Sequence, residues 1–310
     1  MGAGHGHGHG LPQGATASYA YRRRMQLVLV LIGVVMLVQL GGAYLSGSLA
    51  LLADAGHMLA DGLGVTLALL ATAIAAKPAN TARTFGWQRA EILAALTNGV
   101  VVGVIGVLAI VGGVRRLGDP AEIETGIMLV VAVIGLLANV VALFLLRSGQ
   151  RESLNVRGAY LEVMGDTLGS LAVVSAAIVI MATGWVRADA LASMLIGVLI
   201  LPRAWILLRE VFDVLLEATP KGVDLKDVRR HIMELPGVVD VHDLHAWTIT
   251  SGVPVLSAHV VITDSAEPGC GADSVLDGLH ECLAGHFDIE HSTFQIEPLG
   301  HVEHEHAGHA

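Results

Sequence analysis

Two pairs of ionisable residues in strongly apolar stretches are the part of this sequence best suited to chemistry. His57 and Asp61 are four residues apart, and so are Glu162 and Asp166. On a helix this spacing places both members of a pair on one face. One imidazole and three carboxylates facing each other suit a tetrahedral divalent cation such as zinc, although carboxylates also bind manganese.

A site of this kind can also release its ion, because protons compete with metals for imidazole and carboxylate groups. Histidine titrates near neutral pH, so His57 is the natural group to exchange a metal ion for a proton. This chemistry predicts metal export coupled to proton entry. For Asp54, an ion-binding role and a hydrogen bond between helices stay equally open, and Glu91 is better suited to a structural or gating role.

The elements that must position these residues are membrane spans. The chain has 310 residues, of which 54% are hydrophobic, more than a soluble domain of this size can bury. A helix needs about 20 mostly apolar residues to cross a bilayer. Six stretches meet this requirement: 26–45, 50–76, 91–113, 124–146, 159–182 and 189–208.

The basic residues predict the orientation of these spans. Lys and Arg concentrate before the first span, between the second and third, between the fourth and fifth, and after the sixth. Such an excess marks the cytoplasmic side of a membrane. We therefore expect a multi-pass protein of a lipid bilayer with both termini in the cytoplasm, and the general style of the sequence favours a bacterial plasma membrane.

The charge of the chain changes near residue 210. Residues 1–210 carry 14 Lys and Arg against 11 Asp and Glu, whereas residues 211–310 carry 4 against 17. The second part is therefore acidic and water-soluble, and neither part has the basic surface of a nucleic-acid-binding protein. Both cysteines, Cys270 and Cys282, lie in the second part and fit a reducing compartment.

The soluble part is predicted to be a small α+β sandwich. Its strands show period-two alternation, with Leu256 and Ala258 on one face and His259 on the other. A helix–strand–strand–helix–strand order containing a local hairpin favours this architecture. The predicted elements are a helix at Asp224–Leu235, strands at Val238–Thr250 and Val253–Asp264, a helix at Asp273–His286 and a strand at Ser292–Glu297.

The whole chain is thus predicted to be an all-α bundle of six membrane helices followed by a cytoplasmic α+β domain with the order αββαβ. The histidine-rich ends, of which the first alternates with glycine, predict disordered tails that could bind metal only loosely. The predicted boundaries are a tail at 1–24, the membrane domain at 25–210, the soluble domain at 211–299 and a second tail at 300–310.

Three long segments give the sequence a family resemblance. They read SGSLALLADAGHMLAD at Ser46–Asp61, FGWQRAEILAAL at Phe85–Leu96 and VHDLHAW at Val241–Trp247. With them, most of the chain resembles the zinc-transporter branch of the cation diffusion facilitator family. The resemblance implies a ferredoxin-like, metallochaperone-like cytoplasmic domain, a homodimer, and zinc/proton antiport by alternating access.

The resemblance also implies which residues hold the transported ion. The family's transport site falls on His57, Asp61 and Asp166 of this chain. Its fourth position is usually histidine in the zinc branch, and here it is Glu162. A carboxylate can still ligate zinc, but it makes the site harder and more negative, so a preference for manganese or cadmium stays open.

Further metal sites are implied in the cytoplasmic domain, where zinc would act as a regulatory ligand. By motif they fall on His242, His259 and Glu297. The loop at 77–89 contains no His, Asp or Glu, so a site that some relatives have there is expected to be missing. Additional ligand candidates in the soluble domain are His245, His280, Cys282 and His291.

A charge contact is implied between the third span and the start of the cytoplasmic domain. It would join Arg89 to Glu217, with a solvated role for Arg89 as an equal alternative. Rival functions fit the sequence less well. It has neither the His-Glu-x-x-His motif of a metalloprotease nor the Gly-x4-Gly-Lys-Ser/Thr loop of an ATP-driven pump. A membrane-anchored metal sensor would not require charged pairs in two spans, so we expect a secondary transporter and not an enzyme.

Overall fold

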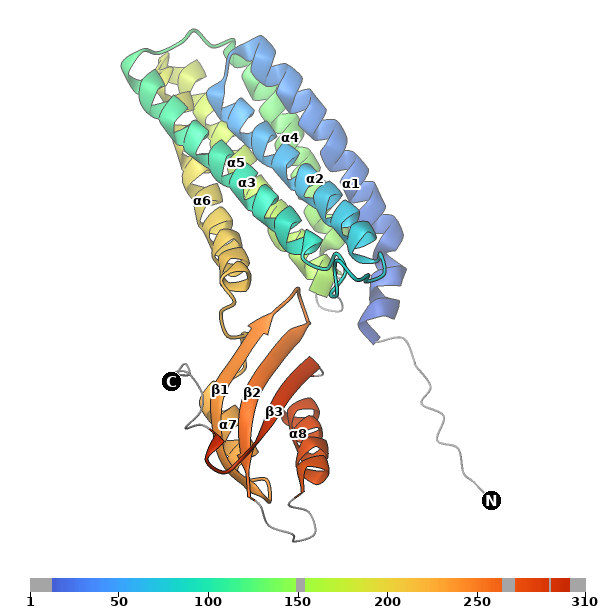
Figure 1. Cartoon of the computed structure of the whole chain (residues 1–310). Coiled ribbons are helices and arrows are strands. Elements are labelled where there is room, and N and C mark those ends of the chain that lie inside the picture. Colours follow the sequence, from blue (N-terminus) through green and yellow to red (C-terminus); the bar gives the residue numbers. More distant parts are fainter. Residues whose placement is uncertain (1–12, 149–153, 264–270, 290, 302–310) are drawn as a thin grey trace. The chain divides into compact units, whose positions relative to one another are not determined.

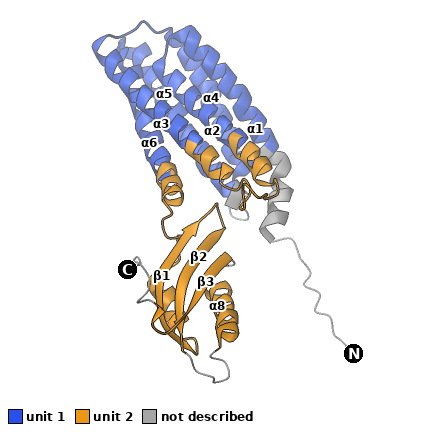
Figure 2. Cartoon of the chain, viewed as in Figure 1, with its two compact units in different colours: residues 1–66, 97–206 blue, residues 67–96, 207–310 orange. Residues whose placement is uncertain are grey.

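The computed structural model describes residues 13–148, 154–263, 271–289 and 291–301, with side chains described from residue 26 in the first helix and from residue 156 in the fifth. The predicted disordered segment Gly4–Gly10 and nearly all of the C-terminal tail lie outside these ranges. The chain divides into two compact units, shown in different colours in Figure 2. Unit 1 comprises residues 1–66 and 97–206, and unit 2 comprises residues 67–96 and 207–310.

Six helices are long and apolar enough to cross a membrane, which confirms the six predicted spans. The first helix begins at Gln13, whereas the apolar span within it starts at Gln26, as predicted. The last continues past residue 208 to Leu215, because Val211, Phe212 and Val214 extend its apolar character. The helices are α1 (Gln13–Ser46), α2 (Leu49–Ala75), α3 (Ala90–Gly118), α4 (Thr125–Leu146), α5 (Leu154–Thr183) and α6 (Arg187–Leu215).

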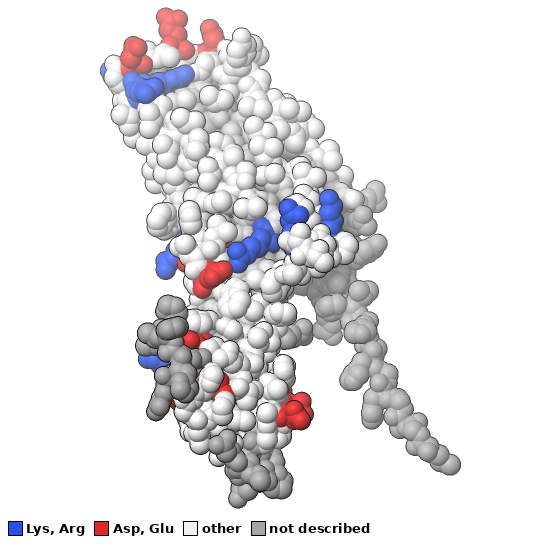
Figure 3. Space-filling view, viewed as in Figure 1, with Lys and Arg blue, Asp and Glu red and all other residues white. Residues whose placement is uncertain are grey.

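Within unit 1 the helices bury small residues against each other and turn large apolar residues outward. Gly106 of α3 and Gly197 of α6 meet so closely that a Cβ atom at Gly197 would lie 2.7 Å from the Gly106 carbonyl oxygen. Leu108, Val130 and Leu137 are more than half exposed, as expected of side chains that face lipid. Figure 3 shows that the visible face of these helices carries charged groups near its ends and almost none between them.

The start of α2 is fixed by a carboxylate from α6. Asp189 is fully buried, and its oxygens accept hydrogen bonds from the backbone N–H groups of Leu49 (2.8 Å) and Ala50 (3.1 Å). Asp189 also accepts hydrogen bonds from the Ser48 hydroxyl (2.5 Å) and the Arg116 guanidinium (3.2 Å). The free N–H groups at the beginning of a helix favour such an anionic acceptor. This contact sets the position of the helix that carries His57 and Asp61.

The soluble part of unit 2 has the predicted αββαβ order. Strands β1 and β2 are antiparallel and β2 and β3 are parallel, in the order β1-β2-β3 (Figure 1). The core lies between the sheet and the two helices and contains Val228, Leu256, Val260 and Leu279. The elements are α7 (Leu225–Met233), β1 (Val238–Thr248), β2 (Pro254–Ile262), α8 (Ala272–His286) and β3 (His291–Pro298).

The alternation of β2 leaves one face of the sheet free for polar side chains. Leu256, Ala258 and Val260 are buried against the helices, so His259 lies on the opposite face. In β1, His242 pairs with His259 and therefore shares its face. An irregularity in the register follows, with Asp243 at a φ of +44°, and it places His245 opposite Ser257 on the same face.

Candidate metal centres

The first candidate metal centre lies in unit 1 between α2 and α5. His57 Nε2 is 3.5 Å from Asp61 Oδ2 and 3.5 Å from Asp166 Oδ1. One ligand atom from each of the three residues lies within 4.8 Å of the others. Zinc bonds of about 2.0–2.1 Å in tetrahedral geometry separate neighbouring ligand atoms by roughly 3.3 Å. Both distances from His57 Nε2 are therefore close to the spacing of neighbouring ligands in a zinc site.

The polar atoms of this cluster have few hydrogen-bond partners in the protein. His57 and Asp166 are buried, with 8% and 3% of their surface exposed. Among the described residues, His57 Nδ1, Asp61 Oδ2 and Asp166 Oδ1 are buried without a hydrogen-bond partner. Buried polar atoms are costly when they are left unsatisfied. The cluster is therefore suited to a cation, which would satisfy both carboxylates at once.

The fourth predicted ligand has a different partner. Glu162 does not belong to the group of ligand atoms formed by His57, Asp61 and Asp166. Its Oε1 instead accepts a hydrogen bond of 2.9 Å from Nη2 of Arg203 on α6, and the two side chains form an ion pair.

Asp54 is engaged in a hydrogen-bond network between helices, the second of the two roles that its sequence position left open. Its Oδ2 accepts hydrogen bonds from Gln39 Nε2 on α1 (2.9 Å) and from the Ser170 hydroxyl on α5 (3.1 Å). Asn139 of α4 donates in turn to the Ser170 hydroxyl over 3.2 Å. Because this network joins four helices, it holds together the bundle around the candidate metal centre.

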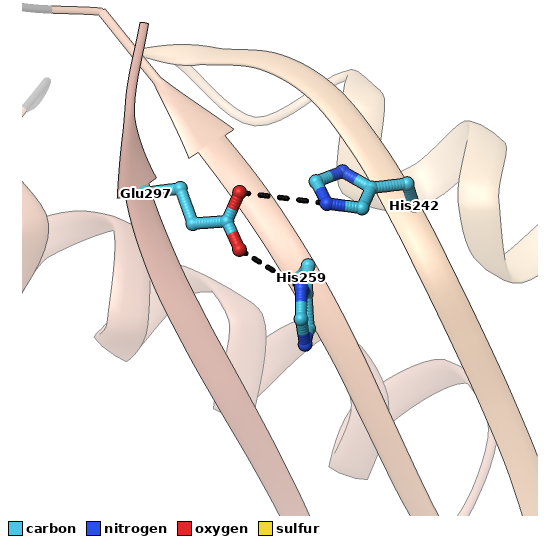
Figure 4. A group of neighbouring side chains, drawn as sticks. All are labelled: His242, His259 and Glu297. Atoms are coloured by element: carbon cyan, nitrogen blue, oxygen red, sulfur yellow. Dashed lines mark ion pairs between the residues drawn. The ribbon is translucent and has the colours of Figure 1, made fainter. Parts of the chain in front are cut away.

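The second candidate metal centre lies on the free face of the soluble sheet, where His242, His259 and Glu297 come from three neighbouring strands (Figure 4). His242 Nε2 is 3.4 Å from Glu297 Oε2, and His259 Nδ1 is 2.8 Å from Glu297 Oε1. Glu297 is only 1% exposed, and its Oε2 has no hydrogen-bond partner among the described residues. Two imidazoles and a carboxylate are a common donor set for zinc, so these residues fit the metal.

The other ligand candidates of the soluble domain are spread over it. His280 Nδ1 lies 2.9 Å from the carbonyl oxygen of Leu276 in its own helix. The ring of His291 packs edge-on against Phe85 at 5.3 Å between centroids. Cys282 is buried in α8, and this burial, followed by the charge of Glu234, raises the pKa of its thiol. Among the described residues, His245, His280, Cys282 and His291 join neither group of candidate ligands.

Unit 2 contains the predicted charge contact. Arg89 Nη2 lies 3.4 Å from Glu217 Oε1, and both side chains are largely exposed. Glu91, for which the sequence favoured a structural or gating role, accepts a hydrogen bond of 2.6 Å from the hydroxyl of Thr250 after β1. Both contacts join the start of α3 to segments that follow α6 in the chain.

Sequence reasoning missed two residues that shape the membrane site. Arg203 lies inside the predicted sixth span, where a basic residue is itself a signal, but its nearness to Arg209 makes it resemble a residue of the span's end. Asp189 lies at the start of the same predicted span, and its charge was an equally good reason to consider it a functional residue. Sequence spacing could not identify the partners of Arg203 and Asp189, because those partners lie on other helices.

Comparison with known proteins matches nearly the whole chain. Residues 25–216 match the family described as "Cation efflux transmembrane domain", and residues 220–299 match "Cation efflux protein, cytoplasmic domain". The chain is 44% identical to the metal cation efflux system protein CzcD of Cupriavidus metallidurans, over 86% of this chain and 83% of that protein.

Two further relatives have similar coverage. The zinc transporter ZitB of Escherichia coli is 42% identical, over 84% of this chain and 83% of that protein. The cadmium, cobalt and zinc/H(+)-K(+) antiporter of Bacillus subtilis is 38% identical, over 86% of each chain.

Proposed function

Because this chain belongs to the cation efflux family of membrane transporters, we propose that it exports divalent metal ions, zinc foremost, from the cytoplasm in exchange for protons. One observation carries the proposal. His57, Asp61 and Asp166 converge inside a bundle of membrane helices, with one ligand atom of each within 4.8 Å of the others, an arrangement that suits a zinc ion. The names of the relatives, which include a zinc transporter and an antiporter, support the same substrate class.

The exchange follows from the chemistry of the three ligands. Two carboxylates and a neutral imidazole carry two negative charges, which balance one divalent cation. The same atoms accept protons when the metal leaves, so the site never has to remain as two bare carboxylates in an apolar bundle. A conformational change that opens the site to either side of the membrane would then couple zinc export to proton entry.

The cytoplasmic group has a regulatory role in this proposal. Zinc bound by His242, His259 and Glu297 would join all three strands of the soluble sheet. The matched cytoplasmic domain supports a homodimer, and the bacterial relatives support a plasma membrane with both termini in the cytoplasm. The soluble domain would then bind zinc in the cytoplasm, the compartment from which zinc is exported.

The test is metal uptake into proteoliposomes that present the cytoplasmic face outward and contain a pH-sensitive dye. Native protein should accumulate zinc while the lumen becomes more alkaline. Asp61→Ala should lower the initial rate by at least about tenfold, because it removes a metal ligand. Asp119→Ala, which removes an exposed carboxylate between α3 and α4, should transport at the native rate. Undiminished uptake by Asp61→Ala would refute the assignment of the site.

The preferred metal is measured in the same vesicles with zinc, cadmium and manganese in competition. We expect zinc and cadmium to be preferred to manganese, because the imidazole of His57 is a softer donor than oxygen. A preference for manganese would show that the carboxylates dominate selectivity.

A further inference from the structure

The pair formed by Glu162 and Arg203 faces the cavity beside the candidate transport site. This cavity has a volume of about 400 Å³, and His57, Glu162 and Arg203 are among the residues that line it. Glu162 comes from α5, one helical turn before Asp166, and Arg203 comes from α6. A permanently charged arginine is thus placed next to residues suited to binding a cation.

The position of the guanidinium has two consequences for Glu162. The hydrogen bond of 2.9 Å to Arg203 occupies the oxygen Oε1, which would otherwise be available to a metal. The ion pair also cancels the charge of the carboxylate, so Glu162 and Arg203 together are neutral, as a neutral histidine would be. Without Arg203, the transport site would combine His57 with the carboxylates of Asp61, Glu162 and Asp166 and carry one negative charge more than zinc can balance.

Neither partner is fully enclosed by protein. The side chains of Arg203 and Glu162 are 51% and 35% exposed. A pair that is partly open to a cavity loses less hydration than a fully buried pair, so both charges can persist beside the site. Pro202 precedes Arg203 in α6. Because proline has no backbone N–H group, one hydrogen bond of the helix is missing next to Arg203.

We infer that Arg203 determines the specificity of the transport site by occupying one oxygen of Glu162 and cancelling its charge, so that His57, Asp61 and Asp166 alone bind the ion. This inference rests on the proposed transport function and refines it. It identifies the substrate class as borderline-soft divalent cations such as zinc and cadmium. With Arg203 removed, Glu162 would be free to ligate, and the site would accept harder cations such as manganese.

The test compares zinc and manganese transport by four full-length proteins in proteoliposomes: native, Arg203→Ala, Glu162→Ala and the double variant. Arg203→Ala should lower the ratio of zinc to manganese transport efficiency by roughly tenfold or more. Glu162→Ala should raise the KM for zinc, because it leaves an unpaired cation beside the site. The double variant should recover a zinc KM close to the native value, since it removes both charges.

Two further variants guard against trivial explanations. Arg203→Gln keeps most of the side-chain volume and should reproduce the loss of selectivity if Arg203→Ala does not fold. Arg209→Ala removes an exposed positive charge from the same helix and should leave the metal preference unchanged. A loss of selectivity in Arg209→Ala equal to that in the Arg203 variants would overturn the inference.

The decisive result is the double variant. If it has the same raised KM for zinc as Glu162→Ala, then Glu162 is a ligand in the native protein and the inference is wrong. Asp61→Ala separates this outcome from a failure of the proposed function. When Asp61→Ala abolishes zinc transport, the transport site stands, whatever the Arg203 variants show.

Discussion

At the scale of single residues, the two candidate metal centres differ in how their carboxylates are held. In the membrane, the buried oxygens Asp61 Oδ2 and Asp166 Oδ1 each lie 3.5 Å from the imidazole of His57 but accept no hydrogen bond among the described residues. In the soluble domain, Glu297 is contacted by both imidazoles and by the amide of Gln295. Each centre therefore keeps carboxylate oxygens without a hydrogen-bond partner among the described residues, two in the membrane and one, Glu297 Oε2, in the soluble domain.

Glu297→Gln should weaken zinc binding by the cytoplasmic group by roughly 10- to 100-fold, because the amide replaces an anionic ligand with a neutral one. The measurement is a zinc titration of the full-length protein carrying Asp61→Ala, which silences the membrane site. The matched control is Glu281→Gln, a change at an exposed position of α8. An unchanged affinity in Glu297→Gln would remove this residue from the site.

At the scale of elements, the membrane site depends on how α2 is anchored at its start. Asp189 satisfies the N–H groups of Leu49 and Ala50 and pairs with Arg116. Because α2 carries His57 and Asp61, a shift of its first turn would move both ligands against Asp166. The contact of Asp189 with the start of α2 therefore affects the metal site indirectly, by setting the position of α2.

Asp189→Ala should destabilise the protein by about 2–3 kcal/mol, the cost of leaving helix N–H groups without their acceptor. It should also reduce zinc transport. The measurement is the thermal midpoint of unfolding in detergent, with Asp119→Ala as the control because that carboxylate is exposed. A midpoint equal to that of the native protein would show that water or other groups replace the cap.

At the scale of the whole molecule, one ion pair joins segments that lie far apart in the chain. Glu217 follows α6 in a left-handed backbone conformation, with a φ of +57°. It pairs there with Arg89, which precedes α3. An exposed ion pair of this kind contributes little to stability, so any importance would lie in conformational change.

Charge reversal tests this contact. Arg89→Glu and Glu217→Arg should each slow zinc transport, because like charges would then face each other, and the combined swap should restore it. The thermal midpoint should stay nearly constant in all three proteins, since the pair is exposed. Native transport rates in both single variants would mean that the arginine is simply a solvated residue of a basic loop.

The sequence by itself determined the classes of element and their order. Six apolar stretches of this length indicate membrane helices, since a helix satisfies the backbone N–H and C=O groups in lipid by hydrogen bonds within its own segment. Strand alternation likewise separated Leu256 and Ala258 from His259, because the period of two is a property of the extended chain. The spacing of four in His57 and Asp61 fixed their common face for the same kind of local reason.

Only the tertiary structure decided which side chains meet across helices. The spacing that paired Glu162 with Asp166 on one face could not show that Glu162 would be bound by Arg203, because that contact depends on the packing of α5 against α6. The same holds for Asp54, whose partners come from α1 and α5. Local periodicity sets the direction of a side chain on its own helix, whereas its partner depends on contacts between segments far apart in the chain.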